Sequence, residues 1–199
     1  MRYASFLNWA LLGLFLLSCA THNPKIVMHT DLGDIILELY PEKAPVTVEN
    51  FLKYVSEDRF RGARFYRVVH LNNQPHDSIR IQVIQGGLMD EGNDQMLPPI
   101  SHETTEQTGI LHKDGVISMA RWKPGTATSE FFICIGPQPE LDYLGKRNPD
   151  GQGFAAFGKV VSGMDIVKKI QQLPEKDQLL EEPVWIHDID IMNRYTPVY

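Results

Sequence analysis

The sequence is poor in features on which several common classes of protein depend. It contains only two cysteines among its 199 residues, Cys19 and Cys134, which is too few for a framework of several disulfides. Its 19 lysines and arginines are outnumbered by 25 aspartates and glutamates, which gives a formal net charge of −6. Because a nucleic-acid-binding protein needs a basic face, we expect no nucleic-acid partner.

The short motifs of hydrolases, nucleotide-binding proteins and zinc enzymes are also missing. The sequence contains no G-x-S-x-G, no G-x-x-x-x-G-K-[ST], no G-x-G-x-x-G and no H-E-x-x-H. The loop KRNPDGQG at residues 146–153 lacks the glutamate that completes a calcium loop, so we interpret it as a tight turn. We therefore expect neither a metal nor a cofactor, and we interpret Ser118 and Ser129 as structural.

An apolar run over residues 6–17 follows a single positive charge at Arg2. This run is shorter than the ~20 residues that span a bilayer, and it indicates a secretory signal peptide. The tetrapeptide LLSC at residues 16–19 resembles the bacterial lipobox. That resemblance implies a diacylglyceryl group on Cys19, cleavage before it and acylation of the new terminus. The alternative is an ordinary cleaved signal whose apolar part ends at a cysteine.

Lipidation of Cys19 would anchor the protein stably to a membrane. The expected organisation is a signal peptide at residues 1–18, a short lipid-anchored linker at 19–24 and one domain at 25–199. We expect export to the bacterial cell envelope, with the domain on the outer membrane facing the periplasm. Cys134 then has no partner, and its apolar surroundings in FFICI predict a buried, inert thiol.

Short apolar runs predict a protein rich in β-strands. The segment KIVMHTDLGDIILELY predicts a hairpin that turns at residues 31–34. Further strands are predicted at RFYRVV, IQVIQGG, GVISMA, SEFFICI, FAAFGKVV and VWIHDIDIM. Many short strands with few helices indicate a closed barrel or a sandwich, and a barrel covered by helices explains strands that are apolar on nearly every residue.

Two helices are predicted between these strands. The first lies in PEKAPVTVENFLKYVSED, with Thr47 as the expected N-cap. Its apolar face consists of Val48, Phe51, Leu52 and Val55. The second helix lies in SGMDIVKKIQQL, and its apolar face consists of Met164, Val167 and Ile170.

Several blocks of the sequence follow one another in the order found in one enzyme family. They are FYRVV, QGG, GVISMA, SEFFI and FGKVVSGMDIV, preceded by DLGDIILELYPEKAPVTVENFLKYV. The sequence therefore resembles the cyclophilin-type peptidyl-prolyl cis–trans isomerases from residue 26 to residue 191. The resemblance implies a closed antiparallel, eight-stranded β-barrel flanked by two α-helices. It also implies isomerisation of X–Pro bonds without a cofactor, proline-containing segments of folding proteins as partners, and a monomer.

The resemblance gives Arg67 the catalytic role. A permanently charged guanidinium with several donors suits a reaction that needs a hydrogen bond to a twisted amide nitrogen and no proton transfer. Strand alternation places Phe65, Arg67 and Val69 on one face and Tyr66 and Val68 on the other. We therefore assign Tyr66 to packing and expect no acid beside Arg67. The alternative for Arg67 is a solvated surface position.

The other site residues are carried over from the family by position. Those implied to bind the substrate are Gln85, Phe132, Val83, Met119, Ala120, Arg121, Leu141 and Phe154. The sequence departs from the family at Gln82, Glu130, Glu140 and Arg121, and by an insertion between Val69 and Val83. Because Gln82 and Glu140 would make the pocket rim less apolar, the alternative function is a catalytically weak module that binds proline-containing segments.

Overall fold

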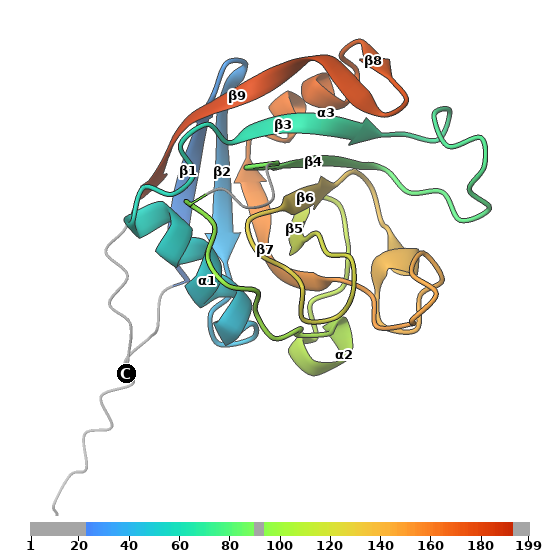
Figure 1. The fold of residues 1–199 in the computed structure, drawn as a ribbon, viewed down its shortest axis with the longest axis horizontal. Coiled ribbons are helices and arrows are strands. Elements are labelled where there is room, and N and C mark those ends of the chain that lie inside the picture. The colour runs from blue at the N-terminus through green and yellow to red at the C-terminus, as the bar shows by residue number, and fades with distance from the viewer. Residues whose placement is uncertain (1–22, 90–93, 193–199) are drawn as a thin grey trace, which may run out of the picture.

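A computed structural model describes residues 23–89 and 94–192 of the chain. Its strands are β1 (Lys25–Thr30), β2 (Gly33–Leu39), β3 (Arg64–Val69), β4 (Val83–Gly87), β5 (Val116–Met119), β6 (Phe131–Cys134), β7 (Ala155–Ser162), β8 (Glu175–Lys176) and β9 (Leu179–Ile191). Its helices are α1 (Pro45–Ser56), α2 (Thr105–Thr108), α3 (Met164–Gln171) and the 3-10 turn η1 (Pro139–Leu141). Figure 1 shows the strands wrapped around a common interior with the helices outside.

The sheet closes on itself. Antiparallel pairing runs in the order β1-β2-β7-β5-β6-β4-β3-β9, and β9 returns to pair with β1. The short strand β8 pairs only with the start of β9, so it extends that hairpin without joining the ring. The structure confirms the predicted closed, eight-stranded antiparallel barrel and excludes the sandwich. All six of the further predicted strands are present, although β9 begins earlier than VWIHDIDIM.

Strand alternation fills the barrel with apolar side chains. In β1 and β2 the interior positions include Ile26, Met28, Ile35 and Leu37, all fully buried. Aromatic rings occupy the space between the sheet and α1, where the rings of Phe51 and Phe131 meet edge to face with centroids 5.7 Å apart. Burial of each large apolar side chain stabilises the fold by ~1.5–3 kcal/mol, so this interior is the main source of stability.

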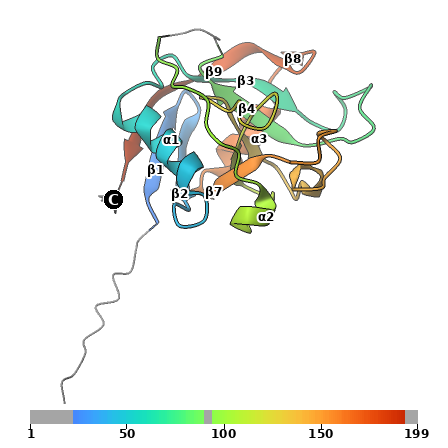
Figure 2. The same ribbon diagram turned by 60° about the horizontal axis from the view of Figure 1, so that its bottom comes forward.

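The described residues form three α-helices, one more than the two predicted. Figures 1 and 2 show α1 and α3 well separated on the outside of the barrel. Both match the predicted helices, and Phe51, Val167 and Ile170 are fully buried. The single turn α2 was not predicted because four residues are too few to show a helical period. It is defined by a capping box, in which Thr104 and Gln107 each bond the other's backbone N–H.

The predicted N-cap of α1 is wrong. The helix begins at Pro45, so Thr47 lies inside its first turn. The exposed backbone N–H groups of that turn are bound by Glu103, which is distant in sequence. Its carboxylate accepts from the N–H of Val46 (3.2 Å), and from the N–H (2.9 Å) and hydroxyl (2.6 Å) of Thr47. A carboxylate at this end also interacts favourably with the helix dipole.

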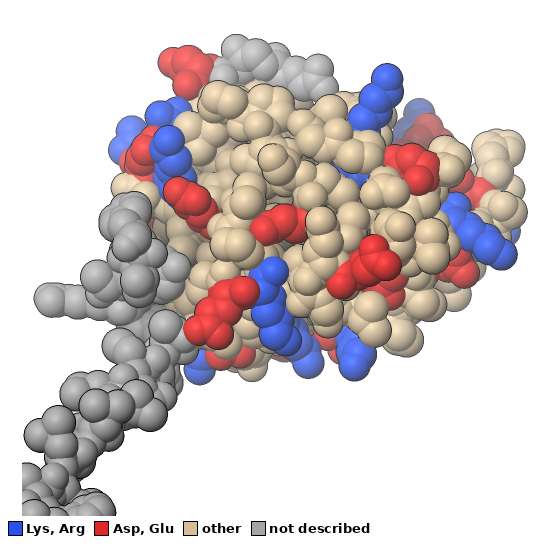
Figure 3. All heavy atoms as spheres, turned by 90° about the horizontal axis from the view of Figure 1, so that it is seen from below, with Lys and Arg blue, Asp and Glu red and all other residues tan. Residues whose placement is uncertain are grey.

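Charged side chains of both signs are interspersed on the face shown in Figure 3, with no extended area of one sign. This distribution gives that face no basic surface for a polyanion. In residues 23–89 and 94–192, none of the helices has both the length and the apolar character needed to cross a bilayer.

The contact between Glu103 and α1 predicts a specific loss of stability. We expect Glu103→Ala to lower the free energy of unfolding by about 1–2 kcal/mol, because it removes the charged cap that binds the N–H groups of the first turn of α1. Glu49→Ala is the matched control, since it removes an exposed glutamate from the same helix. Urea denaturation of both variants measures the difference, and equal stabilities would contradict the capping role.

Candidate active site

A bulge in β3 sets the direction of the side chains that the sequence analysis singled out. Phe65 lies opposite Gly86 of β4, but Arg67 lies opposite Gln85, so Tyr66 is an extra residue on the β3 side. Phe65 points into the barrel interior, while Tyr66 and Arg67 both line a cavity outside it. The predicted alternation is therefore wrong at this point, and Tyr66 does not belong to the packing on the opposite face.

Gly86 makes room for this bulge. A Cβ atom at position 86 would lie 2.8 Å from the carbonyl oxygen of Arg64 and 2.9 Å from Cδ1 of Phe65. Any side chain would force β3 and β4 apart where the bulge passes. The glycine in QGG therefore allows a close approach of backbone to backbone, which is a recurrent use of glycine in strands.

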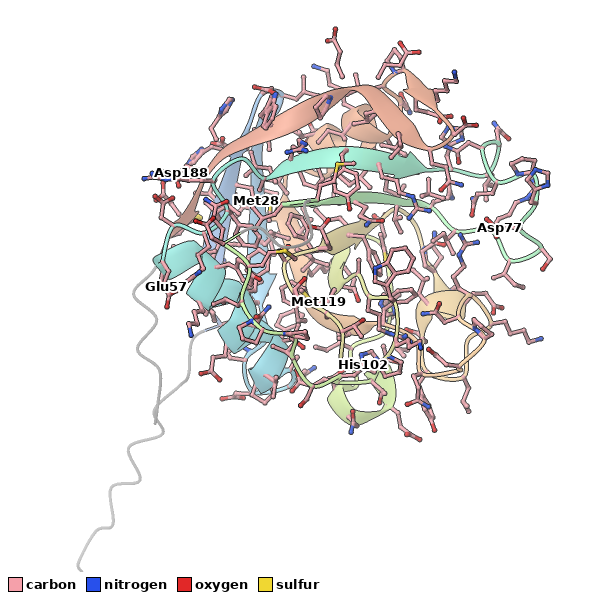
Figure 4. All side chains as sticks on the ribbon, viewed as in Figure 1. Met28, Glu57, Asp77, His102, Met119 and Asp188 are labelled. Carbon is pink, nitrogen blue, oxygen red and sulfur yellow. The ribbon has the colours of Figure 1, made fainter. Side chains whose placement is uncertain are left out.

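The cavity has a volume of about 480 Å³ and brings together most of the expected residues. Seven of the eight predicted substrate-binding residues line it with Arg67: Gln85, Phe132, Val83, Ala120, Arg121, Leu141 and Phe154. The eighth, Met119, points instead into the barrel interior, where it is 1% exposed (Figure 4). Lining residues that the sequence analysis did not assign to the site include Tyr66, Ile81, Met89, Trp122 and Arg147.

Two neutral amides hold the guanidinium of Arg67. Its Nη1 donates to Oε1 of Gln85 (2.8 Å), and its Nε (3.1 Å) and Nη2 (2.5 Å) both donate to Oε1 of Gln178. Within residues 23–89 and 94–192, no carboxylate forms an ion pair with Arg67.

Burial lowers the pKa of Arg67, and the nearby charge of Arg147 lowers it further. One N–H on each terminal nitrogen stays available for a ligand.

A chain of hydrogen bonds continues from Arg67 to Glu130. The Nε2 of Gln85 donates to the hydroxyl of Tyr66 (2.8 Å), which donates to Oε2 of Glu130 (2.5 Å). The other oxygen of Glu130 accepts from the backbone N–H of Met89 (2.9 Å). Burial raises the pKa of Tyr66, and the charge of Glu130 adds to the shift, so the hydroxyl stays protonated. These hydrogen bonds therefore fix the orientation of the Gln85 amide, with Oε1 facing Arg67.

The apolar part of the cavity is a second cluster, separate from the barrel interior. It comprises Val69, Ile81, Val83, Phe132, Cys134 and Leu141, with Ala120 and Phe154 packed against it. The ring of Phe154 meets Phe132 edge on, with centroids 5.2 Å apart. On another side, His112 stacks on Phe132 at 5.9 Å and 16°. Phe132 is thus held by two rings and presents an apolar floor.

Ser118, His112 and Asp142 form an arrangement that resembles a catalytic triad. His112 contacts the Asp142 carboxylate through Nδ1 (2.7 Å) and the Ser118 hydroxyl through Nε2 (3.0 Å). However, Ser118 is fully buried, His112 is 1% exposed, and neither lines the cavity. The arrangement cannot meet a substrate, and it serves to fix the ring that supports Phe132. This agrees with the interpretation of Ser118 as structural.

Arg121 is committed to the neighbouring loop. Its terminal nitrogens bind the Asp150 carboxylate at 2.8 and 3.0 Å, its Nε donates to the Gly153 carbonyl (2.9 Å), and it lies over the ring of Phe154. The hydrogen bonds from Arg121 lower the pKa of Asp150. Arg121 therefore shapes the wall of the cavity by bracing the turn at residues 146–153.

The insertion between β3 and β4 forms an ordered wall. The buried side chain of Gln74 bonds the backbone N–H (3.1 Å) and carbonyl (2.8 Å) of Ile81. Arg147 reaches across to the carbonyl of Ile79 (2.6 Å) and to Asp77 (3.2 Å), which Figure 4 shows on the projecting loop. Ile81 thereby fills an apolar wall position.

Neither Gln82 nor Glu140 lines the cavity. The backbone N–H of Gln82 bonds the side chain of Gln138 (3.2 Å), and the carboxylate of Glu140 accepts from the N–H of Lys146 (2.9 Å). Gln82 and Glu140, on which the alternative of a weak binding module rested, therefore do not make the wall of the cavity less apolar. Among the described residues, no group of three or more His, Cys, Asp or Glu side chains is placed to hold a metal ion.

The closed barrel and its lateral apolar cavity place the chain among the cyclophilin-like barrels, and the comparisons give the family. The family model of the cyclophilin type peptidyl-prolyl cis-trans isomerase/CLD matches residues 25–191. A peptidyl-prolyl cis-trans isomerase of Acinetobacter baylyi is 34% identical over 163 residues, which are 81% of this chain and 79% of the relative. Peptidyl-prolyl cis-trans isomerase B of Escherichia coli is 32% identical, with 78% of this chain and 96% of the relative covered.

A solved structure agrees on the fold. The cyclophilin type peptidyl-prolyl cis-trans isomerase of Cryptosporidium parvum superposes with a TM-score of 0.65 at 21% identity, covering 87% of this chain and 99% of that one. The chain therefore belongs to the cyclophilin-type peptidyl-prolyl cis-trans isomerase family, an enzyme family of the isomerase class.

The environment of Cys134 predicts an unreactive thiol. Cys134 is fully buried, and burial raises its pKa, so little thiolate exists at pH 8. We expect iodoacetamide to leave Cys134 unmodified in the native protein and to modify it fully in guanidinium chloride. Peptide mapping by mass spectrometry measures both states, and rapid labelling of the native protein would contradict the prediction.

Proposed function

We propose that the protein accelerates the cis–trans isomerisation of X–Pro bonds, with Arg67 as the catalytic residue. One observation carries this proposal: Arg67 borders an apolar cavity, held by neutral amides, with two N–H groups available and no ion-paired carboxylate in the described part of the chain. An arginine in that state offers its charge and its donors to a ligand in the cavity.

The reaction requires no bond to be made or broken. Rotation about X–Pro crosses a barrier of ~20 kcal/mol because the amide loses its resonance at the twisted transition state. The nitrogen lone pair is then localised and can accept a hydrogen bond, which it cannot do in either planar ground state. A fixed donor at that nitrogen therefore stabilises the transition state selectively. No base or nucleophile is needed beside it.

The cavity supplies the second requirement, a dry grip on the proline ring. Phe132, Val83, Leu141 and Ile81 provide apolar surfaces in one cluster. In our proposal, Gln85 also hydrogen-bonds the substrate backbone with the N–H that Tyr66 does not engage. Apolar burial holds the ring, and the polar wall of Arg67 and Gln85 orients the amide over it.

Substitution of Arg67 tests the catalytic role. We expect Arg67→Ala to lower the isomerisation rate by about 10²–10³, the usual cost of removing a pre-aimed donor. NMR exchange on an Ala-X-Pro peptide measures the rate, with the exposed Arg61→Ala as the matched control. A wild type no faster than Arg67→Ala would contradict the proposal, and peptide binding without faster exchange would favour the weak binding module.

We further propose that the enzyme acts on folding or assembling proteins of the cell envelope while lipid-anchored through Cys19, on the outer membrane facing the periplasm. Cys19 and the signal sequence lie outside the described residues, and the support comes from the LLSC motif. The first strand starts at Lys25, only six positions after Cys19, which at ~3.3 Å per residue keeps the barrel close to the membrane.

Membrane attachment has its own test. We expect Cys19→Ala to move the protein from the membrane fraction to the soluble fraction, since the acyl chains supply the attachment. Cys134→Ala is the control, because it removes the other cysteine and leaves the lipobox intact. Fractionation followed by immunodetection measures the distribution, and a Cys19→Ala variant that stays wholly with membranes would rule out this anchor.

A further inference from the structure

The turn between β8 and β9 has an unusual conformation for its residues. Asp177 and Gln178 form its two central positions, with φ of 54° and 71°. Two successive positive φ values are typical of the type I′ hairpin turn, which favours asparagine and glycine. A glutamine in the left-handed region carries a conformational cost, so its side chain and contacts require an explanation.

Every polar group of Gln178 has a partner, and the partners come from three segments. Its backbone N–H donates to the Glu175 carboxylate (2.6 Å), and its carbonyl accepts from the N–H of Val68 (2.8 Å). Its Nε2 donates to the carbonyl of Asn73 in the insertion (3.0 Å). Because Nε2 is engaged there, Oε1 must face β3, where it accepts both N–H groups on one edge of Arg67.

This contact lies outside the cavity that Arg67 borders. Gln178 does not line the cavity, whereas Arg67 and Gln85 do. Gln85 alone would hold one terminal nitrogen and leave the guanidinium free to swing about that contact. The second amide binds the opposite edge, so the plane of the group is defined by two anchors.

We propose that Gln178 is a positioning residue that orients Arg67 without neutralising it. A carboxylate at the same place would bind the two N–H groups equally well, but its charge would offset the charge that the twisted amide needs. A neutral amide supplies geometry and leaves the charge available. This inference rests on the proposed catalytic role of Arg67.

The conformation of the turn allows a clean experiment. Gln178→Gly removes the side chain while placing at φ 71° the residue best suited to that conformation, so the turn should keep its backbone geometry. We expect kcat to fall by about tenfold, with KM changed by less than about twofold, because a displaced catalytic group loses alignment and not binding. ¹⁵N relaxation of the Arg67 Nε–H group should show increased motion.

A second substitution separates orientation from charge. In Gln178→Glu we expect the Arg67 Nε–H group to stay rigid while kcat still falls several-fold. Asp177→Asn is the matched control, since it alters the neighbouring position of the same turn, keeps a residue that tolerates positive φ, and should retain the wild-type kcat.

The outcomes distinguish this inference from the proposed function. If the wild type is active and Gln178→Gly retains its kcat and a rigid Arg67, the positioning role is refuted and the role of Arg67 stands. A fully active Gln178→Glu would refute the need for a neutral group. A wild type no faster than Arg67→Ala would refute the proposed function itself.

Discussion

Between Phe65 and Arg67, strand β3 gains one residue relative to β4, and this bulge determines what the surrounding side chains can do. Without it, alternation would carry Phe65 and Arg67 to the same face, and either a large ring would leave the interior or a charge would enter it. The bulge separates them: Phe65 is fully buried in the barrel, and Arg67 faces the cavity with Tyr66. Gly86 permits the distortion, so the site requires both the extra residue in β3 and the glycine in β4.

Local patterns in the sequence predicted the strands and the two longer helices, whereas the resemblance to the cyclophilin family implied the closed eight-stranded barrel and most of the residues that line the cavity. Strands of apolar or alternating residues, and helices with a periodic apolar face, depend on local patterns that a single sequence displays. The bulge does not depend on a local pattern, because it is a relation between β3 and β4. The assignment of Tyr66 to packing was wrong for that reason. Glu103 and Gln178 act on residues 56 and 111 positions away, so no local pattern could reveal the helix cap or the second anchor of Arg67.

Access and charge, and not residue identity alone, separate structural from chemical roles in this molecule. Ser118, His112 and Asp142 have the contacts of a hydrolytic triad, yet the burial of Ser118 and His112 leaves the three residues a support for Phe132. Arg121 and Arg67 both border the cavity, yet Arg121 is neutralised by Asp150 whereas Arg67 is bound by amides. A guanidinium that is oriented but not neutralised is the rarer state, since a buried charge usually finds a counter-charge.

The insertion between β3 and β4 is coupled to this state. Its residue Ile81 completes the apolar wall, and its carbonyl at Asn73 engages the amide nitrogen of Gln178, which leaves only the oxygen to face Arg67. An amide bound on one side alone could rotate and present its NH₂ group to the guanidinium, where two donors would oppose each other. The insertion thus decides the polarity of the contact on Arg67. Loops outside the barrel therefore set the electrostatic environment of the arginine, while the barrel fixes its position.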